Sequence, residues 1–179
     1  MKKLQILIPF IVLLVLTGCG QGFSEGGYFA NVKALVGEVK SDIEEISRDD
    51  LMKIMEKEEL RVLIDVREVS EFDEGFINQP DEDDEYPYAE TFTVNIPRGI
   101  LEFKIDSSDY WDDELWIEMP PKDENIVLYC QTGGRSALAA FALKQLGYTN
   151  VRSLKGGYRK WLDPNAPEEE AVKSSGGCG

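Results

Sequence analysis

Short runs that contain β-branched and other apolar residues, two of them apolar at every position, recur along the central part of this chain, with polar or helically spaced segments between them. The runs cover residues 43–46, 62–64, 94–96, 126–129 and 151–154, and they predict five strands. Strands that are apolar on both faces are typical of a parallel sheet covered on both sides. We therefore expect an α/β domain, with a mainly parallel five-stranded sheet and helices on both faces.

Three segments between or after these runs predict helices. Ser47 precedes apolar residues at helical spacing and is a candidate N-cap. A longer helix is expected from about Ser136 to Leu146, with Gly147 as its C-terminal stop, and a short helix over residues 158–162. Ligands of parallel sheets bind beyond the carboxyl ends of the strands. Cys130 directly follows the fourth run, so it is expected at such a position.

The first residues of the chain have the pattern of an exported protein. Lys2 and Lys3 precede an apolar run over residues 4–16 that is too short to span a bilayer comfortably. The following Leu-Thr-Gly-Cys, residues 16–19, resembles the bacterial lipobox, in which the cysteine is lipid-modified and starts the mature chain. We expect a lipoprotein signal peptide over residues 1–18 and a lipid anchor on Cys19, which places the protein in the cell envelope, extracytoplasmic, on the outer membrane or the periplasmic face if the envelope is Gram-negative. An ordinary cleaved signal peptide with a chance cysteine, or a buried apolar segment, is the alternative.

Composition shifts divide the remainder of the chain. Residues 19–38 are expected to be a flexible tether that joins the anchor to the domain, since Gly, Ser and Gln are frequent at its start. The domain is expected over residues 39–165, followed by a flexible acidic and glycine-rich tail, residues 166–179. An acidic insertion at residues 81–90 is expected to be a solvated loop, because it lacks the spacing of a calcium-binding loop. It is also a candidate lip over the pocket.

Composition excludes several kinds of chemistry. The chain has no histidine, which excludes Ser/His/Asp triads, Cys/His dyads and histidine-ligated zinc. Its three cysteines, at positions 19, 130 and 178, are too scattered for a zinc site or a disulfide framework. The formal net charge of -15 argues against a nucleic-acid partner. We expect no metal, no cofactor, and contact with a membrane through the lipid anchor.

The segment Cys-Gln-Thr-Gly-Gly-Arg-Ser, residues 130–136, joins the fourth predicted strand to a helix. Its two glycines allow successive backbone N–H groups to turn toward one point, which makes a cradle for an anion. The positive helix end and Arg135 both favour the thiolate form of Cys130. The candidate catalytic residues are therefore Cys130 and Arg135, and the candidate substrate-binding loop is Gln131, Thr132, Gly133, Gly134 and Ser136. A buried structural cysteine before a turn is the alternative.

The Cys130 and Arg135 pair, separated by four residues and followed by a serine, resembles the active-site loop of the rhodaneses. Other motifs of that family occur in order: Asp65-Val66-Arg67-Glu68 with Glu71 and Phe72, then Asn95-Ile96-Pro97, then Leu154, Gly156, Gly157 and Trp161. The resemblance implies a rhodanese-like single-domain sulfurtransferase of the thiosulfate sulfurtransferase type. Cys130 would take sulfur from a donor anion such as thiosulfate and, as a persulfide, pass it to cyanide or a thiol. Asp65 and Arg67 would form a buried pair with a structural role.

Two other interpretations stay open. Related cysteine phosphatases and arsenate reductases have five residues between the cysteine and the arginine, which suits a larger oxyanion, so the four-residue loop favours sulfur transfer. A non-catalytic rhodanese-like module of the cell envelope, which binds sulfur or another protein, is the second function class.

The chain departs from the family pattern after the Asp-Val-Arg motif. Where the family often has Gly-His-Ile, this chain has Gly75, Phe76 and Ile77. Cys178 is expected to be an inert terminal thiol, and a role as sulfur acceptor or resolving cysteine is the alternative.

Overall fold

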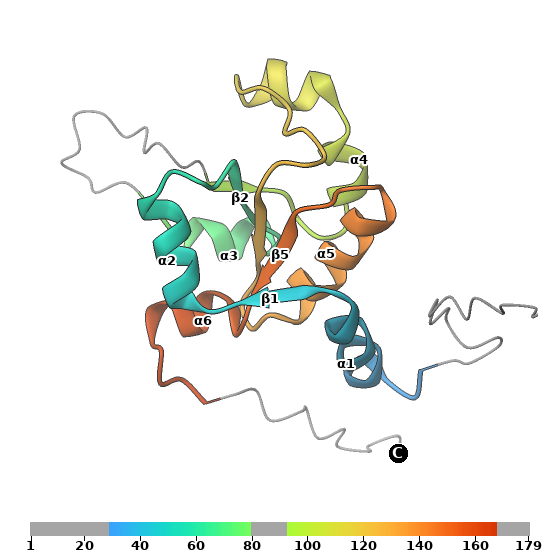
Figure 1. Cartoon of the computed structure of the whole chain (residues 1–179), viewed down its shortest axis with the longest axis vertical. Coiled ribbons are helices and arrows are strands. Elements are labelled where there is room, and N and C mark those ends of the chain that lie inside the picture. The colour runs from blue at the N-terminus through green and yellow to red at the C-terminus, as the bar shows by residue number, and fades with distance from the viewer. Residues whose placement is uncertain (1–28, 80–92, 168–179) are drawn as a thin grey trace, which may run out of the picture.

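The computed structural model describes residues 29–79 and 93–167 (Figure 1). Its strands are β1 (Glu44–Ile46), β2 (Val62–Asp65), β3 (Thr93–Asn95), β4 (Ile126–Tyr129) and β5 (Val151–Leu154). They form one sheet in the order β1-β5-β4-β2-β3, and every pairing is parallel. The expected five-stranded α/β architecture is confirmed. Every residue of β2 and β4 is buried, which explains why these strands read as continuous apolar runs.

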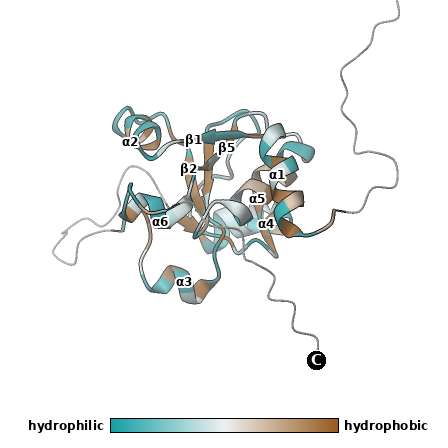
Figure 2. Cartoon of the chain, turned by 90° about the horizontal axis from the view of Figure 1, so that it is seen from below, coloured by the Kyte–Doolittle hydropathy of each residue, from teal (hydrophilic) through white to brown (hydrophobic). Residues whose placement is uncertain are grey.

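Helices cover both faces of the sheet (Figure 1). They are α1 (Val32–Asp42), α2 (Arg48–Glu56), α3 (Val69–Asp73), α4 (Leu101–Ile105), the π-helix η1 (Tyr110–Glu114), α5 (Gly134–Gln145) and α6 (Gly157–Leu162). On one face, Ala139 and Leu143 of α5 pack with Ile64 and Leu128. On the other face, Leu51 of α2 belongs to a second apolar cluster, with Leu63, Val127 and Tyr129. Figure 2 shows the strands largely in brown at the centre, with teal on α2 and α6 at the outside.

The helix ends agree with the sequence signals at two places and differ at a third. Ser47 caps α2, and its side chain accepts a hydrogen bond from the Asp50 N–H. The last residue of α5 is followed by a cap at Leu146 and then by Gly147, whose φ of +89° is left-handed. At its other end, however, α5 begins at Gly134, two residues before the predicted start, so its first turn lies within the candidate loop.

The predicted flexible tether is wrong for residues 32–38, which form most of α1. The Asn31 side chain caps this helix by accepting a hydrogen bond from the Ala34 N–H, and Val39 is buried. At the far end, Lys144 of α5 donates a hydrogen bond to the carbonyl of Asp42. The helix forms because it packs along α5, a partner more than a hundred residues away that the local composition does not reveal.

Within the two described ranges, no helix is long and apolar enough to cross a membrane. The expected signal peptide, Cys19, the acidic insertion at residues 81–90 and Cys178 lie outside these ranges.

Candidate active site

Cys130 lies immediately after β4, at the carboxyl edge of the sheet, and its side chain is buried. Two donors reach its sulfur: the Gly133 backbone N–H at 3.2 Å, and the Ser136 hydroxyl at 3.6 Å. Gly133 is the N-cap residue of α5 and adopts a left-handed φ of +92°, which lets the loop curl around the sulfur. Cys130 therefore faces the positive N-terminal end of a twelve-residue helix, where an anion is stabilised.

The turn between β5 and α6 supports the loop from below. The Tyr158 N–H donates to the carbonyl oxygen of Cys130 at 2.7 Å, and the Arg159 N–H donates to that of Gln131 at 3.1 Å. Gly157 makes these bonds possible, because a Cβ at this position would lie 2.1 Å from the carbonyl oxygen of Cys130. Gly157, the second residue of the Gly156-Gly157 pair, is therefore required because two backbone segments are in direct contact there.

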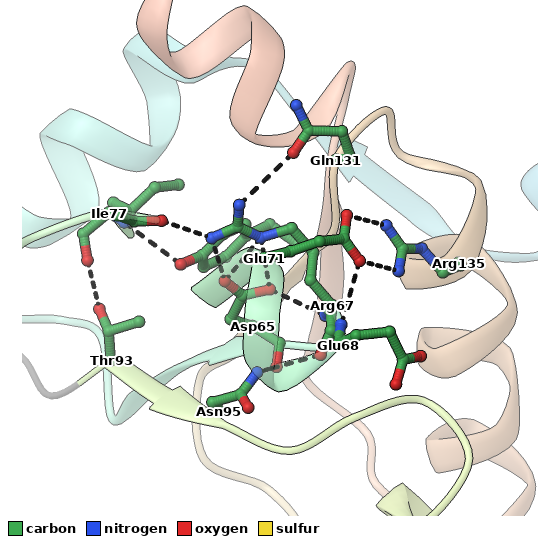
Figure 3. A network of polar contacts seen from close by, with 11 residues as sticks. Asp65, Arg67, Glu68, Glu71, Ile77, Thr93, Asn95, Gln131 and Arg135 are labelled. Atoms are coloured by element: carbon green, nitrogen blue, oxygen red, sulfur yellow. Dashed lines mark hydrogen bonds and ion pairs between the residues drawn. The ribbon is translucent and has the colours of Figure 1, made fainter. Parts of the chain in front are cut away.

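Arg135, in the first turn of α5, does not stand free beside the sulfur. Its two terminal nitrogens donate to the two carboxylate oxygens of Glu71 on α3, at 2.6 and 2.7 Å (Figure 3). The hydrogen bond from Arg135 holds the pKa of Glu71 below its usual value and is also the main reason that the pKa of Arg135 is raised. The sequence suggests Glu71 only as part of the motif that resembles the family, and does not predict its contact with Arg135. Its local signal is its place three residues after Glu68, in a capping box at the start of α3.

Asp65 and Arg67 form the expected buried pair at the end of β2. Arg67 donates from Nε and Nη2 to the Asp65 carboxylate at 2.6 to 3.0 Å, and both side chains are almost fully buried. Arg67 also donates to the Gly75 carbonyl at 2.7 Å and approaches the Gln131 side-chain oxygen at 3.4 Å (Figure 3). Its guanidinium carbon lies 4.2 Å from the ring centre of Tyr158. Through Arg67, the pair links the end of β2 to Gln131 in the active-site loop and to Tyr158 in α6, which supports that loop.

The other predicted loop residues lie between the end of β4 and the first turn of α5. Thr132 and Gln131 are partly exposed, and Gly134 opens α5 next to Val36 of α1. Across residues 29–79 and 93–167, no group of three acidic or cysteine side chains is arranged to hold a metal ion. The arrangement places one nucleophilic sulfur against a backbone N–H and a hydroxyl at the start of a helix, close to a guanidinium that is paired with a carboxylate.

Comparison with known proteins assigns the domain to a family. The family model for the rhodanese-like domain matches residues 47–164. A putative mitochondrial thiosulfate sulfurtransferase of Schizosaccharomyces pombe is 33% identical over 103 residues, and a human thiosulfate:glutathione sulfurtransferase is 36% identical over 72 residues. These matches cover 57% and 39% of this chain, respectively, and 63% of each relative, so the chain spans less than two thirds of their length.

Two solved structures share the fold. The human single-domain sulfurtransferase TSTD1 superposes with a TM-score of 0.55 at 28% identity, over 66% of this chain and 94% of that one. A protein of unknown function from Rhodopseudomonas palustris, described as a possible tyrosine phosphatase, has the same TM-score at 27% identity, over 80% and 97%. With the family model matching well over half of its length, the chain belongs to the rhodanese-like domain family.

Proposed function

We propose that this protein is a sulfurtransferase that moves a sulfane sulfur from a donor such as thiosulfate to cyanide or a thiol, through a persulfide on Cys130. The observation that carries the proposal is the position of the Cys130 sulfur. It lies at the N-terminal end of α5, where the Gly133 N–H and the Ser136 hydroxyl both donate to it. Such a site favours a sulfur anion over a neutral thiol.

In the first half-reaction, the Cys130 thiolate attacks the outer sulfur of thiosulfate. A bond forms between Sγ and that sulfur while the sulfur–sulfur bond of thiosulfate breaks, and its electron pair leaves with sulfite. In the second half-reaction, cyanide or a thiolate attacks the outer sulfur of the persulfide. The electron pair of the persulfide bond returns to Sγ, which becomes a thiolate again. Both steps need an anion held at one place, which is the role of the N–H groups at the start of α5.

The contacts of Arg135 limit how it serves this reaction. Because two of its five N–H donors already bind Glu71, we expect Arg135 to share the binding of the substrate with the free backbone N–H groups at the start of α5. Arg135 contributes its charge, partly neutralised, and fixes the first turn of α5. The human relative, whose name includes both thiosulfate and glutathione, supports an anionic donor and a thiol acceptor.

The ring of four residues between Cys130 and Arg135 argues against hydrolysis of phosphate esters. A loop of this length is one residue shorter than that of the related cysteine phosphatases, so we expect it to fit a further sulfur atom on Cys130 better than a tetrahedral phosphate. The phosphatase description of the Rhodopseudomonas palustris neighbour therefore does not carry over.

The decisive experiment follows sulfur on Cys130 by mass spectrometry. After treatment with thiosulfate, the peptide that contains Cys130 should gain one sulfur atom, and cyanide should remove it as thiocyanate. Cys130→Ser should abolish both steps, because a hydroxyl is far too weak an acid to be an anion here. Cys178→Ser is the matched control, and it should leave the first half-reaction intact. A folded wild-type protein that takes up no sulfur from any sulfane donor would instead support the non-catalytic envelope module.

We also propose that the protein is a lipoprotein, anchored through Cys19 and exposed on the extracytoplasmic side of a membrane. The support is the lipobox-like pattern at residues 16–19 after a charged and apolar leader. Multiple acyl chains on one cysteine are enough to hold a domain at a membrane surface.

A further inference from the structure

Two buried serine hydroxyls lie behind the Cys130 sulfur, and only one of them belongs to the active-site loop. Ser136 Oγ lies 3.6 Å from Sγ and 2.8 Å from the Oγ of Ser153. Ser153 is on β5, where it pairs in register with Leu128 of β4. Both serine side chains have zero exposure, and that of Cys130 is 1% exposed. The three side chains therefore form a chain of hydrogen bonds that water does not reach.

Ser153 is an unusual residue for its position. It lies in β5, between β1 and β4, and α5 packs against this strand. A buried hydroxyl is unfavourable unless it forms a hydrogen bond. Among the described residues, the hydroxyl of Ser153 has one hydrogen-bond partner, Ser136 Oγ. Its polar group is therefore stabilised only through the residue that contacts the sulfur.

The number of protons fixes the direction of the chain. A thiolate only accepts hydrogen bonds, so Ser136 must use its single proton to donate to Sγ. The oxygen of Ser136 then accepts, and the proton between the two serines must come from Ser153. In this arrangement every hydroxyl proton has an acceptor. If a neutral thiol donated to Ser136 instead, the two hydroxyl protons would share one contact between the serines, and one of them would have no acceptor among the described residues.

We propose that Ser153 is a positioning residue for Cys130: its hydroxyl holds that of Ser136 in the orientation that donates to the sulfur, and the pair thereby favours the thiolate. Ser153 does not touch the reacting atoms, so its effect passes entirely through Ser136.

The consequence for turnover rests on the proposed sulfur transfer. Sγ is the nucleophile of the first half-reaction and the leaving group of the second, and it carries the negative charge at the start of one and at the end of the other. A donor that is fixed toward Sγ therefore assists both. The outer sulfur of the persulfide is not its target, so Ser153 should matter little for the stability of the persulfide once it has formed.

The test measures how the alkylation rate of Cys130 by iodoacetamide depends on pH, with the modified peptide resolved by mass spectrometry so that Cys19 and Cys178 do not interfere. The variants are Ser153→Ala, Ser136→Ala and the double variant. Ser153→Ala should raise the pH midpoint by about 0.5 unit, and Ser136→Ala by about 1 unit. The double variant should match Ser136→Ala alone, because Ser153 acts only through Ser136.

Thr93→Val is the matched control, since it removes a strand hydroxyl of the same sheet that is bound to the Ile77 carbonyl. It should leave the midpoint unchanged. An unshifted midpoint in Ser153→Ala, additive shifts in the double variant, or an equal shift in Thr93→Val would each overturn the proposal.

The uptake of sulfur from thiosulfate by the wild-type protein is measured separately. If no sulfur is taken up, the proposed function is contradicted, but the alkylation midpoints still test the role of Ser153. If sulfur uptake is normal and the midpoints do not move, the proposed function stands and the role of Ser153 falls.

Discussion

The carboxylate of Glu71 and the guanidinium of Arg135 meet in a two-point ion pair, with nitrogen–oxygen distances of 2.6 and 2.7 Å. The pair joins α3 to the first turn of α5, across 64 positions of sequence. Both side chains are about one third exposed, so this ion pair lies at the surface of the protein. An arginine that appears in the sequence as a free positive charge is thus half of a neutral pair.

Replacement of Arg135 separates its charge from its effect on the loop. Arg135→Ala should slow persulfide formation from thiosulfate by about tenfold or more, but should change the alkylation of Cys130 by neutral iodoacetamide much less. Arg135→Lys keeps the charge and loses the two-point contact, so it should recover part of the thiosulfate rate. Stopped-flow kinetics of both reactions make the comparison. Equal losses with the two reagents would mean that Arg135 mainly shapes the loop.

The Glu71 pair should make stability depend on pH. Because the hydrogen bond from Arg135 lowers the pKa of Glu71 in the folded protein, the pair stabilises fully above the ordinary glutamate pKa and is lost as pH falls through the lowered value. Urea unfolding should find Glu71→Gln less stable than wild type by about 1 kcal/mol at neutral pH. This difference should stay constant above the ordinary glutamate pKa and shrink as the pH falls below it toward the lowered value. A difference that persists in acid would assign the loss to packing.

The Asp65 and Arg67 pair should be far more sensitive to substitution than the exposed ion pairs. Asp65→Asn leaves the guanidinium of Arg67 buried without its counter-charge, and should cost about 3–5 kcal/mol of unfolding free energy. Glu114→Gln, which removes the partner of Lys104 at a largely exposed position, should cost less than about 1 kcal/mol. Chemical denaturation of both variants tests the contrast, and similar losses would contradict it.

Gly157 should tolerate no side chain. A Cβ there would lie 2.1 Å from the Cys130 carbonyl oxygen, at a backbone φ of +60°. Gly157→Ala should therefore displace the loop and lower stability by about 2–4 kcal/mol, with loss of sulfur uptake. Gly99→Ala is the control, because nothing lies within 4 Å of the Cβ it would add. Full sulfur uptake by Gly157→Ala would show that the loop can be held without the close approach.

The anchor can be tested in cells that process lipoproteins. The full-length protein should fractionate with membranes and incorporate labelled fatty acid. Cys19→Ser should remove the label, and should accumulate as unprocessed precursor or be released, because the acylated residue is missing. Cys178→Ser should behave as wild type. Normal processing and membrane retention of Cys19→Ser would contradict lipidation.

Short, strong patterns in the sequence predicted the sheet and the place of the nucleophile. The strands over residues 62–64 and 126–129 are apolar at every position because helices cover both faces of the sheet. Their burial can therefore be predicted from consecutive apolar residues. The same holds for Cys130, which follows a buried strand and precedes a glycine-rich turn. The short α3, α4 and η1, of five residues each, gave no such pattern, because they are too brief to show a helical period.

The tertiary structure alone decided which residues meet around the sulfur. Arg67 approaches Gln131, and Glu71 pairs with Arg135, because β2 and β4 are neighbours in the sheet although they are far apart along the chain. Ser153 reads as an ordinary polar residue within a strand until β5 is placed beside β4 and below α5. A sequence shows the burial of a strand through its own residues, but a contact between distant side chains exists only once the order of the strands is fixed, and that order is set by packing over the whole domain.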